Sequence, residues 1–254
     1  MSTAPVPVLL PRARRLTVPN GAPYTGQDCE NNHKLSAYVV MTTPRISDSA
    51  VRRLSHYLRF LEDFESEGRE TISSGDLAER GGTTSAQVRK DLSHFGSFGK
   101  RGLGYPVPVL HARLAEILGV GRHWSLALAG AGKLGAALHA YDGFRRRGFH
   151  IVAVFDNDPR KIGRRWGAIT VEDVRRLADS VREKGVEIGI VVTPAEGAQE
   201  VAEAMVAAGI SAILNFAPRK LVLPPGVTLQ DVNLAIELEA LCFALTHEGW
   251  EVGR

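Results

Sequence analysis

Residues 124–156 read WSLALAGAGKLGAALHAYDGFRRRGFHIVAVFD and contain the strongest structural pattern of the chain. It opens with an apolar run at 124–129, passes through the loop GAGKLG at 130–135, and closes with a second apolar run that ends in Asp156. The order of strand, glycine loop, helix, strand and acid predicts a βαβ unit of a parallel sheet. We therefore expect an α/β protein with a Rossmann-type sheet.

The glycine loop predicts a dinucleotide site, although a purely structural turn is the alternative. Gly130 permits a tight turn, Gly132 lets the backbone approach a pyrophosphate, and Gly135 lets helix and strand pack closely. The start of the helix offers free amides to phosphates. Asp156 would accept hydrogen bonds from an adenine ribose and repel a 2′-phosphate, which favours NAD(H) over NADP(H). The candidate contacts here are Gly130, Ala131, Gly132, Lys133, Leu134, Gly135 and Asp156.

A basic segment follows Asp156 and contains Arg160, Lys161, Arg164 and Arg165. These residues could hold a 2′-phosphate, which would favour NADP(H) instead. We prefer to interpret them as a solvated turn.

Alternating apolar segments continue the sheet. We predict a helix at 171–184, a strand at 188–192, a helix at 196–208, and strands at 212–214 and 227–230. Ligands bind at the carboxyl ends of such strands, so Thr193, Pro194, Asn215 and Phe216 are candidate cofactor contacts. Proline-terminated strands are the alternative interpretation of these positions.

The segment from about His56 to Phe95 predicts a helix-turn-helix. A helix begins near Ser47 with an apolar stripe, a second helix covers 74–80, and Gly81-Gly82 makes the turn. Residues 84–87 fit a capping box that opens a third helix, and the glycine-rich stretch 96–105 suits a two-stranded wing. The stripe consists of Val51, Leu54, Leu58, Leu61 and Phe64, and Val88, Leu92 and Phe95 form the inner side of the third helix.

Local charge adds a second indication. The net charge is +3, yet residues 80–122 hold seven Lys and Arg against two Asp and Glu. A solvated basic face is the alternative to major-groove binding through phosphates and base edges. The candidate DNA contacts are Ser85, Gln87, Arg89, Lys90, His94, Lys100 and Arg101.

Composition excludes several classes of protein. The 254 residues are 44% hydrophobic and 23% charged, and no run of about 18 uncharged apolar residues exists for a membrane helix. Cys29 and Cys242 lie too far apart in sequence for a disulfide framework, and neither zinc spacing nor a Ser/His/Asp set is legible. We expect a cytoplasmic protein with neither a metal nor catalytic residues.

Four regions are expected. Residues 1–45 contain six of the thirteen prolines and predict a disordered arm, unless translation starts at Met41. A winged-helix domain with a linking helix (107–118) covers 46–122, and a Rossmann domain covers 123–232. Residues 233–254 form a final helix and tail. The leucines at 234, 238, 241 and 245 predict a stripe that is buried on the sheet or in a dimer.

Four segments resemble the Rex family of redox-sensing transcriptional repressors. They are VRKDLSHFGSFGKRGLGY at 88–105, the GAGKLG loop, ILNFAP at 213–218 and VNLAIEL at 232–238. The resemblance covers about 46–247. It implies a homodimer that binds an inverted-repeat operator through winged helices, senses NADH and NAD⁺ in the Rossmann domain, and releases DNA on binding NADH. It also implies that the C-terminal helix exchanges between subunits.

Three features depart from the family pattern. His94 stands where a Tyr is usual, Asn233 stands where an Asp is common, and the N-terminal arm has no counterpart. Asn233 weakens any charge pair with Arg59 of the first helix, although a neutral hydrogen bond could replace it.

The leading hypothesis and its rivals differ in what the Rossmann site does. For a repressor, groups near the nicotinamide must distinguish NADH from NAD⁺, and Tyr141, Phe216 and the partner's C-terminal helix are the candidates. An NAD-dependent oxidoreductase would need a substrate domain or a positioned acid or base, for which little chain remains. A repressor that responds to coenzyme A or another nucleotide is the third hypothesis.

Overall fold

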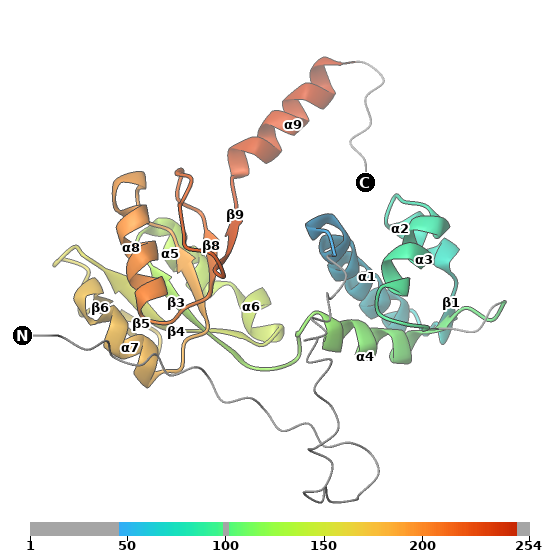
Figure 1. Ribbon diagram of the computed structural model, residues 1–254, viewed down its shortest axis with the longest axis horizontal. Coiled ribbons are helices and arrows are strands. Elements are labelled where there is room, and N and C mark those ends of the chain that lie inside the picture. Colours follow the sequence, from blue (N-terminus) through green and yellow to red (C-terminus); the bar gives the residue numbers. More distant parts are fainter. Residues whose placement is uncertain (1–45, 99–101, 248–254) are drawn as a thin grey trace, which may run out of the picture. The chain divides into compact units, whose positions relative to one another are not determined.

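The computed structural model describes residues 46–98 and 102–247 (Figure 1). Its first part is helical. The elements are α1 (Asp48–Ser66), β1 (Thr71–Ile72), α2 (Ser74–Arg80), α3 (Ser85–Ser93), β2 (Tyr105–Pro106) and α4 (Val107–Ile117). This order is that of a winged helix-turn-helix, as predicted.

Helix α1 begins where the sequence predicts. The Ser47 hydroxyl caps it by accepting a hydrogen bond from the Ala50 amide. Leu54, Leu58, Leu61 and Phe64 are buried in the helical core together with Val88 and Leu92 of α3. Two details of the predicted stripe are wrong, because Val51 is 41% exposed and Tyr57, which lies between Leu54 and Leu61 on the same face, is buried.

The wing differs from the prediction in which strands it uses. Tyr105–Pro106 pairs antiparallel with Thr71–Ile72, which lies before α2. Among the described residues of 96–105, Tyr105 is in a strand and Gly104 forms a bridge, whereas residues 96–98 do neither, so these residues do not form the two strands that were predicted within that stretch. A strand of two residues has too little periodicity to be found from sequence.

The second part is a seven-stranded sheet with the order β5-β6-β4-β3-β7-β8-β9. All neighbours are parallel except β5 and β6. Without the edge strand β5, this is the doubly wound Rossmann order, which reverses between β3 and β7. The strands are β3 (Trp124–Ala129), β4 (Phe149–Asp156), β5 (Arg165–Trp166), β6 (Ile169–Asp173), β7 (Ile188–Val191), β8 (Ala212–Asn215) and β9 (Thr228–Asp231).

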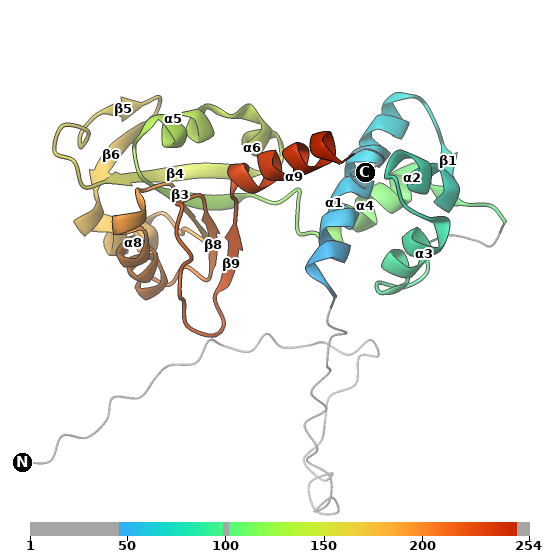
Figure 2. The ribbon, with the colours of Figure 1, turned by 90° about the horizontal axis from the view of Figure 1, so that it is seen from above.

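Helices cover both faces of this sheet (Figure 2). Side chains of β3 alternate between two cores: Ala127 and Ala129 join one, and Leu126 and Leu128 join the other. The first core also holds buried residues of α7 and α8, and the second holds partly buried residues of α5 and α6. These helices are α5 (Lys133–Ala140), α6 (Asp142–Arg146), α7 (Leu177–Glu183) and α8 (Ala195–Ala207).

The helix predicted at 171–184 is partly wrong. Residues 169–173 form β6, which pairs with β4 through Val171 and Val154, and the 3₁₀ turn Val174–Arg176 leads into α7. Val171, Val174, Leu177 and Val181 do have helical spacing. Pairing within the sheet overrides that local pattern for the first three residues.

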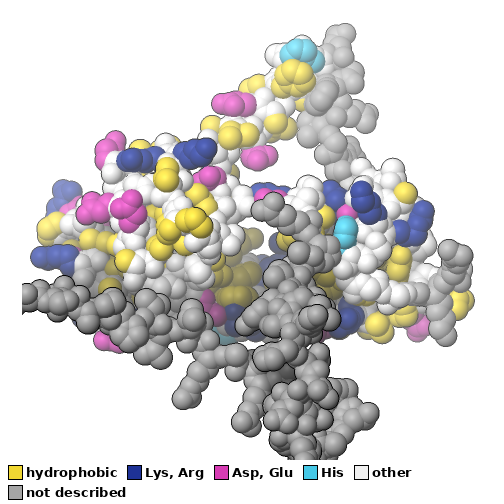
Figure 3. Space-filling model, viewed as in Figure 1, with side chains coloured by type: hydrophobic (Ala, Val, Ile, Leu, Met, Phe, Trp, Pro, Cys, Tyr) yellow, Lys and Arg dark blue, Asp and Glu magenta, His cyan; other side chains and the backbone are white. Residues whose placement is uncertain are grey.

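The chain's last described helix is α9 (Leu234–Thr246), which the Asn233 side chain caps through the Ala235 amide. None of its residues, all of which the structure describes, is buried in the single chain. Burial on the sheet is therefore wrong for the leucine stripe. Figure 3 shows hydrophobic side chains along this helix, and those most exposed are Leu234, Ile236, Leu238, Leu241, Phe243 and Leu245.

Candidate nucleotide and DNA sites

The loop after β3 is held by two close backbone approaches. Gly130 has a φ of +112°, and a Cβ there would lie 2.7 Å from the Val192 carbonyl oxygen. A Cβ on Gly135 would lie 2.1 Å from the carbonyl oxygen of Gly130. A Cβ on Gly132, in contrast, meets no described atom within 4 Å. Two glycines therefore fold the loop, and the third keeps a space open.

That open space belongs to a cavity of about 990 Å³ at the carboxyl ends of the strands. The cavity lies where the strand order reverses, which is the ligand position of doubly wound sheets. Helix α5 starts at its wall with Gly132 as N-cap, and within the described residues no side chain caps this helix. Its first amides are thus free for phosphate oxygens. The predicted residues that line the cavity are Gly130, Gly132, Lys133, Leu134, Asp156, Thr193, Pro194 and Phe216.

Asp156 is 8% exposed and is strongly hydrogen-bonded. Its Oδ2 accepts bonds from the Ala131 amide at 2.7 Å and from Lys161 Nζ at 3.0 Å, and Oδ1 accepts one from the Asp158 amide at 2.8 Å. Burial would raise the pKa of Asp156, but these bonds outweigh it and hold the pKa below its usual value. The carboxylate is therefore charged at neutral pH and suits ribose hydroxyls.

The basic segment after Asp156 is largely the solvated turn that we preferred, because Arg160, Arg164 and Arg165 are exposed, and Lys161 is the exception. Arg160 is bonded to Asp158, and Lys161 lines the cavity through its ion pair with Asp156. A ribose that binds Asp156 would share the carboxylate with Lys161 or displace it.

Other cavity residues differ in their fit to a ligand. The Thr193 hydroxyl oxygen is buried and has no partner among the described residues, so a ligand group could satisfy it. Asn215 does not line the cavity. Its amide donates to the Arg219 carbonyl at 2.9 Å and to Asp231 Oδ1 at 2.8 Å, which ties β8 to the end of β9. Ala131 and Gly135 shape the loop without lining the cavity.

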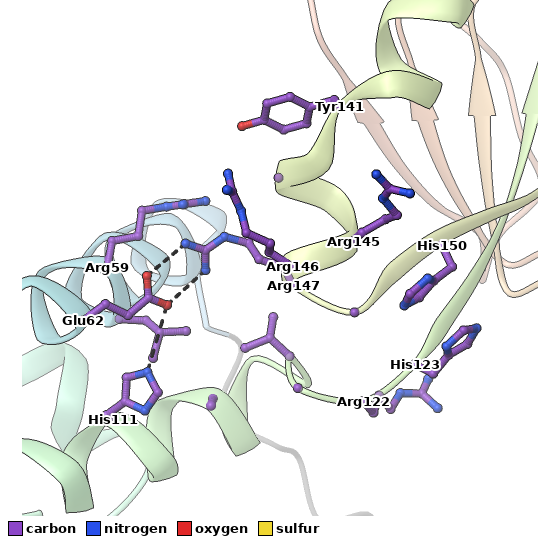
Figure 4. A pocket seen from close by; sticks show the side chains of 16 residues that line it. Arg59, Glu62, His111, Arg122, His123, Tyr141, Arg145, Arg146, Arg147 and His150 are labelled. Carbon is purple, nitrogen blue, oxygen red and sulfur yellow. Dashed lines mark hydrogen bonds and ion pairs between the residues drawn. The ribbon is translucent and has the colours of Figure 1, made fainter. Parts of the chain in front are cut away.

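Tyr141 lies outside this cavity and is 57% exposed. It lines a second cavity of about 750 Å³ with basic side chains from several elements, including Arg59 of α1 (Figure 4). Glu62 accepts bonds from Arg147 at 3.0 and 3.2 Å there. Asn233 does not line it, and in the described chain its side chain caps α9.

The outer face of α3 carries the predicted DNA residues. Arg89 is exposed and donates to the Ser74 hydroxyl at 3.0 Å, whereas the Lys90 ammonium has no partner among the described residues. Ser85 is half-buried on the first turn, and His94 is exposed at the C-cap. Lys100 and Arg101 lie outside the described residues.

The predicted capping box is half wrong. The Thr84 hydroxyl does accept a hydrogen bond from the Gln87 amide at 3.1 Å. The Gln87 side chain, however, donates to Asp91 instead of returning to the backbone of Thr84. Asp91 and its partner Arg53 on α1 are residues that the sequence analysis missed, although Asp91 lies on the same helical face as Val88 and Phe95.

Two absences concern the described residues alone. No group of three or more His, Cys, Asp and Glu side chains among them is arranged to hold a metal ion. None of the helices in 46–98 and 102–247 has the length and hydrophobicity of a membrane-spanning segment.

A winged helix with an exposed basic recognition helix, joined to a Rossmann sheet with an open phosphate loop, defines the class of nucleotide-responsive DNA-binding regulators. Residues 45–93 match the family described as "Putative DNA-binding protein N-terminus", and residues 122–219 match "CoA binding domain". The chain belongs to the Rex family of redox-sensing transcriptional repressors. It is 49% identical to Rex of Desulfitobacterium hafniense and 48% identical to Rex of Carboxydothermus hydrogenoformans. These matches cover 80% of this chain and 97% and 98% of those relatives.

Solved structures agree with this assignment. The Rex-family repressor RSP in complex with β-NAD⁺ and operator DNA is 37% identical, with a TM-score of 0.76 over 79% of this chain and 93% of that one. RSP in complex with β-NADH is 36% identical, with a TM-score of 0.73 over 80% and 95%. The relatives are named as repressors, so they do not support the oxidoreductase hypothesis.

Proposed function

We propose that this protein is a repressor that binds an inverted-repeat operator as a homodimer and releases it when NADH occupies the Rossmann cavity. The observation that carries the proposal is the match to RSP with β-NAD⁺ and operator DNA. That match covers 79% of the chain, a share that requires both the winged helix and the Rossmann sheet. The proposal includes a cytoplasmic location, where operator and dinucleotides meet.

The cavity residues have distinct tasks in this proposal. The amides of Lys133 and Leu134 bind the pyrophosphate, and Asp156 binds the adenine ribose. NADH and NAD⁺ differ in the charge, planarity and one hydride of the nicotinamide ring, so the discriminating groups must lie near that ring. Phe216 lines the cavity, and Tyr141 and the partner's α9 remain candidates.

Release of DNA requires differential binding. A ligand shifts an equilibrium between two dimer forms only by its difference in affinity for them. NADH must therefore have a higher affinity for the dimer form that cannot bind the operator than for the form that binds it.

The dimer of the proposal uses α9. Six large apolar side chains of this helix are exposed in the single chain, and a second copy would cover them. Exchange of the helix between subunits is the arrangement that we expect.

The first test measures binding of the purified protein to DNA from upstream of its own gene at fixed salt, titrated with NADH and then with NAD⁺. We expect release at a much lower NADH concentration than NAD⁺ concentration. Binding that ignores both dinucleotides would contradict the sensing role, and absence of binding would contradict the repressor role.

Coenzyme A is the second candidate effector, because residues 122–219 match the family described as "CoA binding domain". A competition experiment, in which NADH fluorescence reports whether coenzyme A displaces NADH from the cavity, distinguishes the two candidate effectors. We expect NADH to be retained in the presence of equimolar coenzyme A.

Two variants test the division of labour. Asp156→Ala should weaken the response to NADH and leave operator binding intact, because the carboxylate lies at the cavity wall. Arg89→Ala should weaken operator binding and leave NADH binding intact. Loss of both activities in each variant would contradict the division.

A further inference from the structure

The carboxylate of Asp91 is the centre of a buried hydrogen-bond network. Asp91 lies on the inner face of α3 and is 1% exposed. Arg53 of α1 donates to it through Nε at 2.6 Å and Nη2 at 2.8 Å, and Tyr57 of α1 donates through its hydroxyl at 3.0 Å. The fourth donor is Nε2 of Gln87 at 2.7 Å, one helical turn earlier on α3. Each carboxylate oxygen thus accepts two bonds.

This network keeps Asp91 ionised. Burial would raise the pKa of Asp91, but the bonds from Arg53, Gln87 and Tyr57 outweigh it and hold the pKa below its usual value. Burial and the same carboxylate raise the pKa of Tyr57, so its hydroxyl keeps the proton that it donates.

An ionised carboxylate also fixes the orientation of Gln87. Such a group can only accept hydrogen bonds, so the atom of Gln87 that faces it must be the amide nitrogen and not the oxygen. Gln87 is half-buried on the first turn of α3. Its Oε1 and its second amide hydrogen have no partner among the described residues. Because Nε2 is bonded to Asp91, the orientation of the carboxamide fixes where these two groups lie.

We propose that Gln87 reads an adenine in the major groove and that Asp91 is the buried positioning residue that orients its carboxamide. Recognition helices present their N-terminal residues to base edges, and Gln87 is the third residue of α3. A carboxamide matches adenine by donating to N7 and accepting from N6, which are the two functions that Gln87 retains. The inference rests on the proposed DNA-binding function.

The neighbours of Gln87 on α3 have a different chemistry. Arg89 and Lys90 are exposed cations, which can bind phosphates of any sequence or a guanine edge but do not match an adenine edge as a carboxamide does. Asp91 itself cannot reach DNA, because it is buried. Its effect on sequence preference must therefore pass through Gln87.

The test is selection from duplexes with a randomised core, followed by sequencing, with the full chain. Wild type should enrich a symmetric motif. Gln87→Ala should lose about tenfold or more of the discrimination at one adenine in each half-site. Asp91→Asn should lose discrimination at the same adenine, because an asparagine can donate or accept and allows the Gln87 amide to turn over.

Controls separate this role from a purely structural one. Ser93→Ala removes a hydroxyl of the same helix that bonds only to the Lys90 carbonyl among the described residues, and it should leave the motif unchanged. The double variant Gln87→Ala/Asp91→Asn should show no further loss at that adenine beyond Gln87→Ala. Should Asp91→Asn fail to fold, Asp91→Glu keeps the charge, displaces the oxygens by one methylene, and should give the same loss.

Other results would overturn the inference. The inference is contradicted if Gln87→Ala keeps every base preference of wild type, or if the position at which it loses discrimination is not an adenine. Asp91 variants that bind all sequences more weakly while keeping the wild-type motif would reduce Asp91 to a structural residue. If wild type enriches no motif, the failure lies with the proposed DNA-binding function instead.

Discussion

At the scale of single residues, the glycines of the nucleotide loop separate folding from binding. A Cβ on Gly135 would lie 2.1 Å from a backbone oxygen, whereas a Cβ on Gly132 would project into free space at the cavity. The two positions therefore form a matched pair for mutation, because the same methyl group is added to the same loop.

We predict that Gly135→Ala lowers the free energy of unfolding by about 1–3 kcal/mol and weakens NADH binding, since the backbone must move. Gly132→Ala should cost less, about 0.5–1 kcal/mol, because alanine is a poorer N-cap than glycine, and it should still weaken NADH binding, because its methyl group blocks the phosphates. Urea unfolding and NADH fluorescence measure the two effects. Normal NADH binding by Gly132→Ala would place the phosphates elsewhere.

Lys90 allows a prediction about charge. Lys90→Ala should weaken DNA binding for all sequences alike and reduce the slope of log affinity against log salt by about 1, because one phosphate contact is lost. Binding isotherms at several salt concentrations measure this slope. Lys220→Ala, which removes an exposed lysine of the sheet part, is the control and should leave the slope unchanged.

At the scale of elements, the caps show how α2 is held in the helix-turn-helix. The Ser73 hydroxyl accepts hydrogen bonds from the amides of Gly75 and Asp76. In return, the Asp76 carboxylate accepts a hydrogen bond from the Ser73 amide. Bonds from Ser73 and from Arg69 lower the pKa of Asp76 to about 2. A lowered pKa stabilises the fold above the ordinary carboxyl pKa, and this stabilisation is lost as the pH falls through the folded value.

We therefore predict that Asp76→Ala costs about 1 kcal/mol of stability at neutral pH. The difference from wild type should shrink as the pH falls from about 4 towards about 2, because wild type then loses the same bonds. Urea unfolding across this range is the measurement. Glu79→Ala, on the exposed side of α2, is the control, and a cost for Asp76→Ala that ignores pH would contradict the role of the ionised carboxylate.

Elements also show what could be predicted from sequence and why. The strand, glycine loop and second strand at 124–156 were recognisable because each has a strong local pattern, and their bounds agree with the structure within a few residues. Strand β5 was missed because it has only two residues, and β6 was missed because its sequence has the helical spacing of the segment that follows it; both depend on pairing with a neighbour. Asp91 was missed because a charged residue on an apolar helical face can be assigned only when its partners Arg53 and Tyr57 are known.

At the scale of the whole molecule, the apolar surface of α9 predicts the state of assembly. We expect a dimer in sedimentation experiments, and Leu238→Lys combined with Leu241→Lys should give a monomer, because both side chains are exposed in the single chain. Val222→Lys is the control, since Val222 is also an exposed apolar residue but lies on the sheet part. A double variant that remains dimeric would show that other surfaces form the dimer.

The connection from cavity to α9 has a mechanical consequence. Phe216 lines the cavity, and the adjacent Asn215 is bonded to Asp231, two residues before the cap of α9. A helix of this length extends about 20 Å, so a tilt of about 10° at its base displaces its far end by about 3 Å. The length of α9 therefore amplifies small shifts around a nicotinamide ring in the cavity into larger displacements at the far end of the helix.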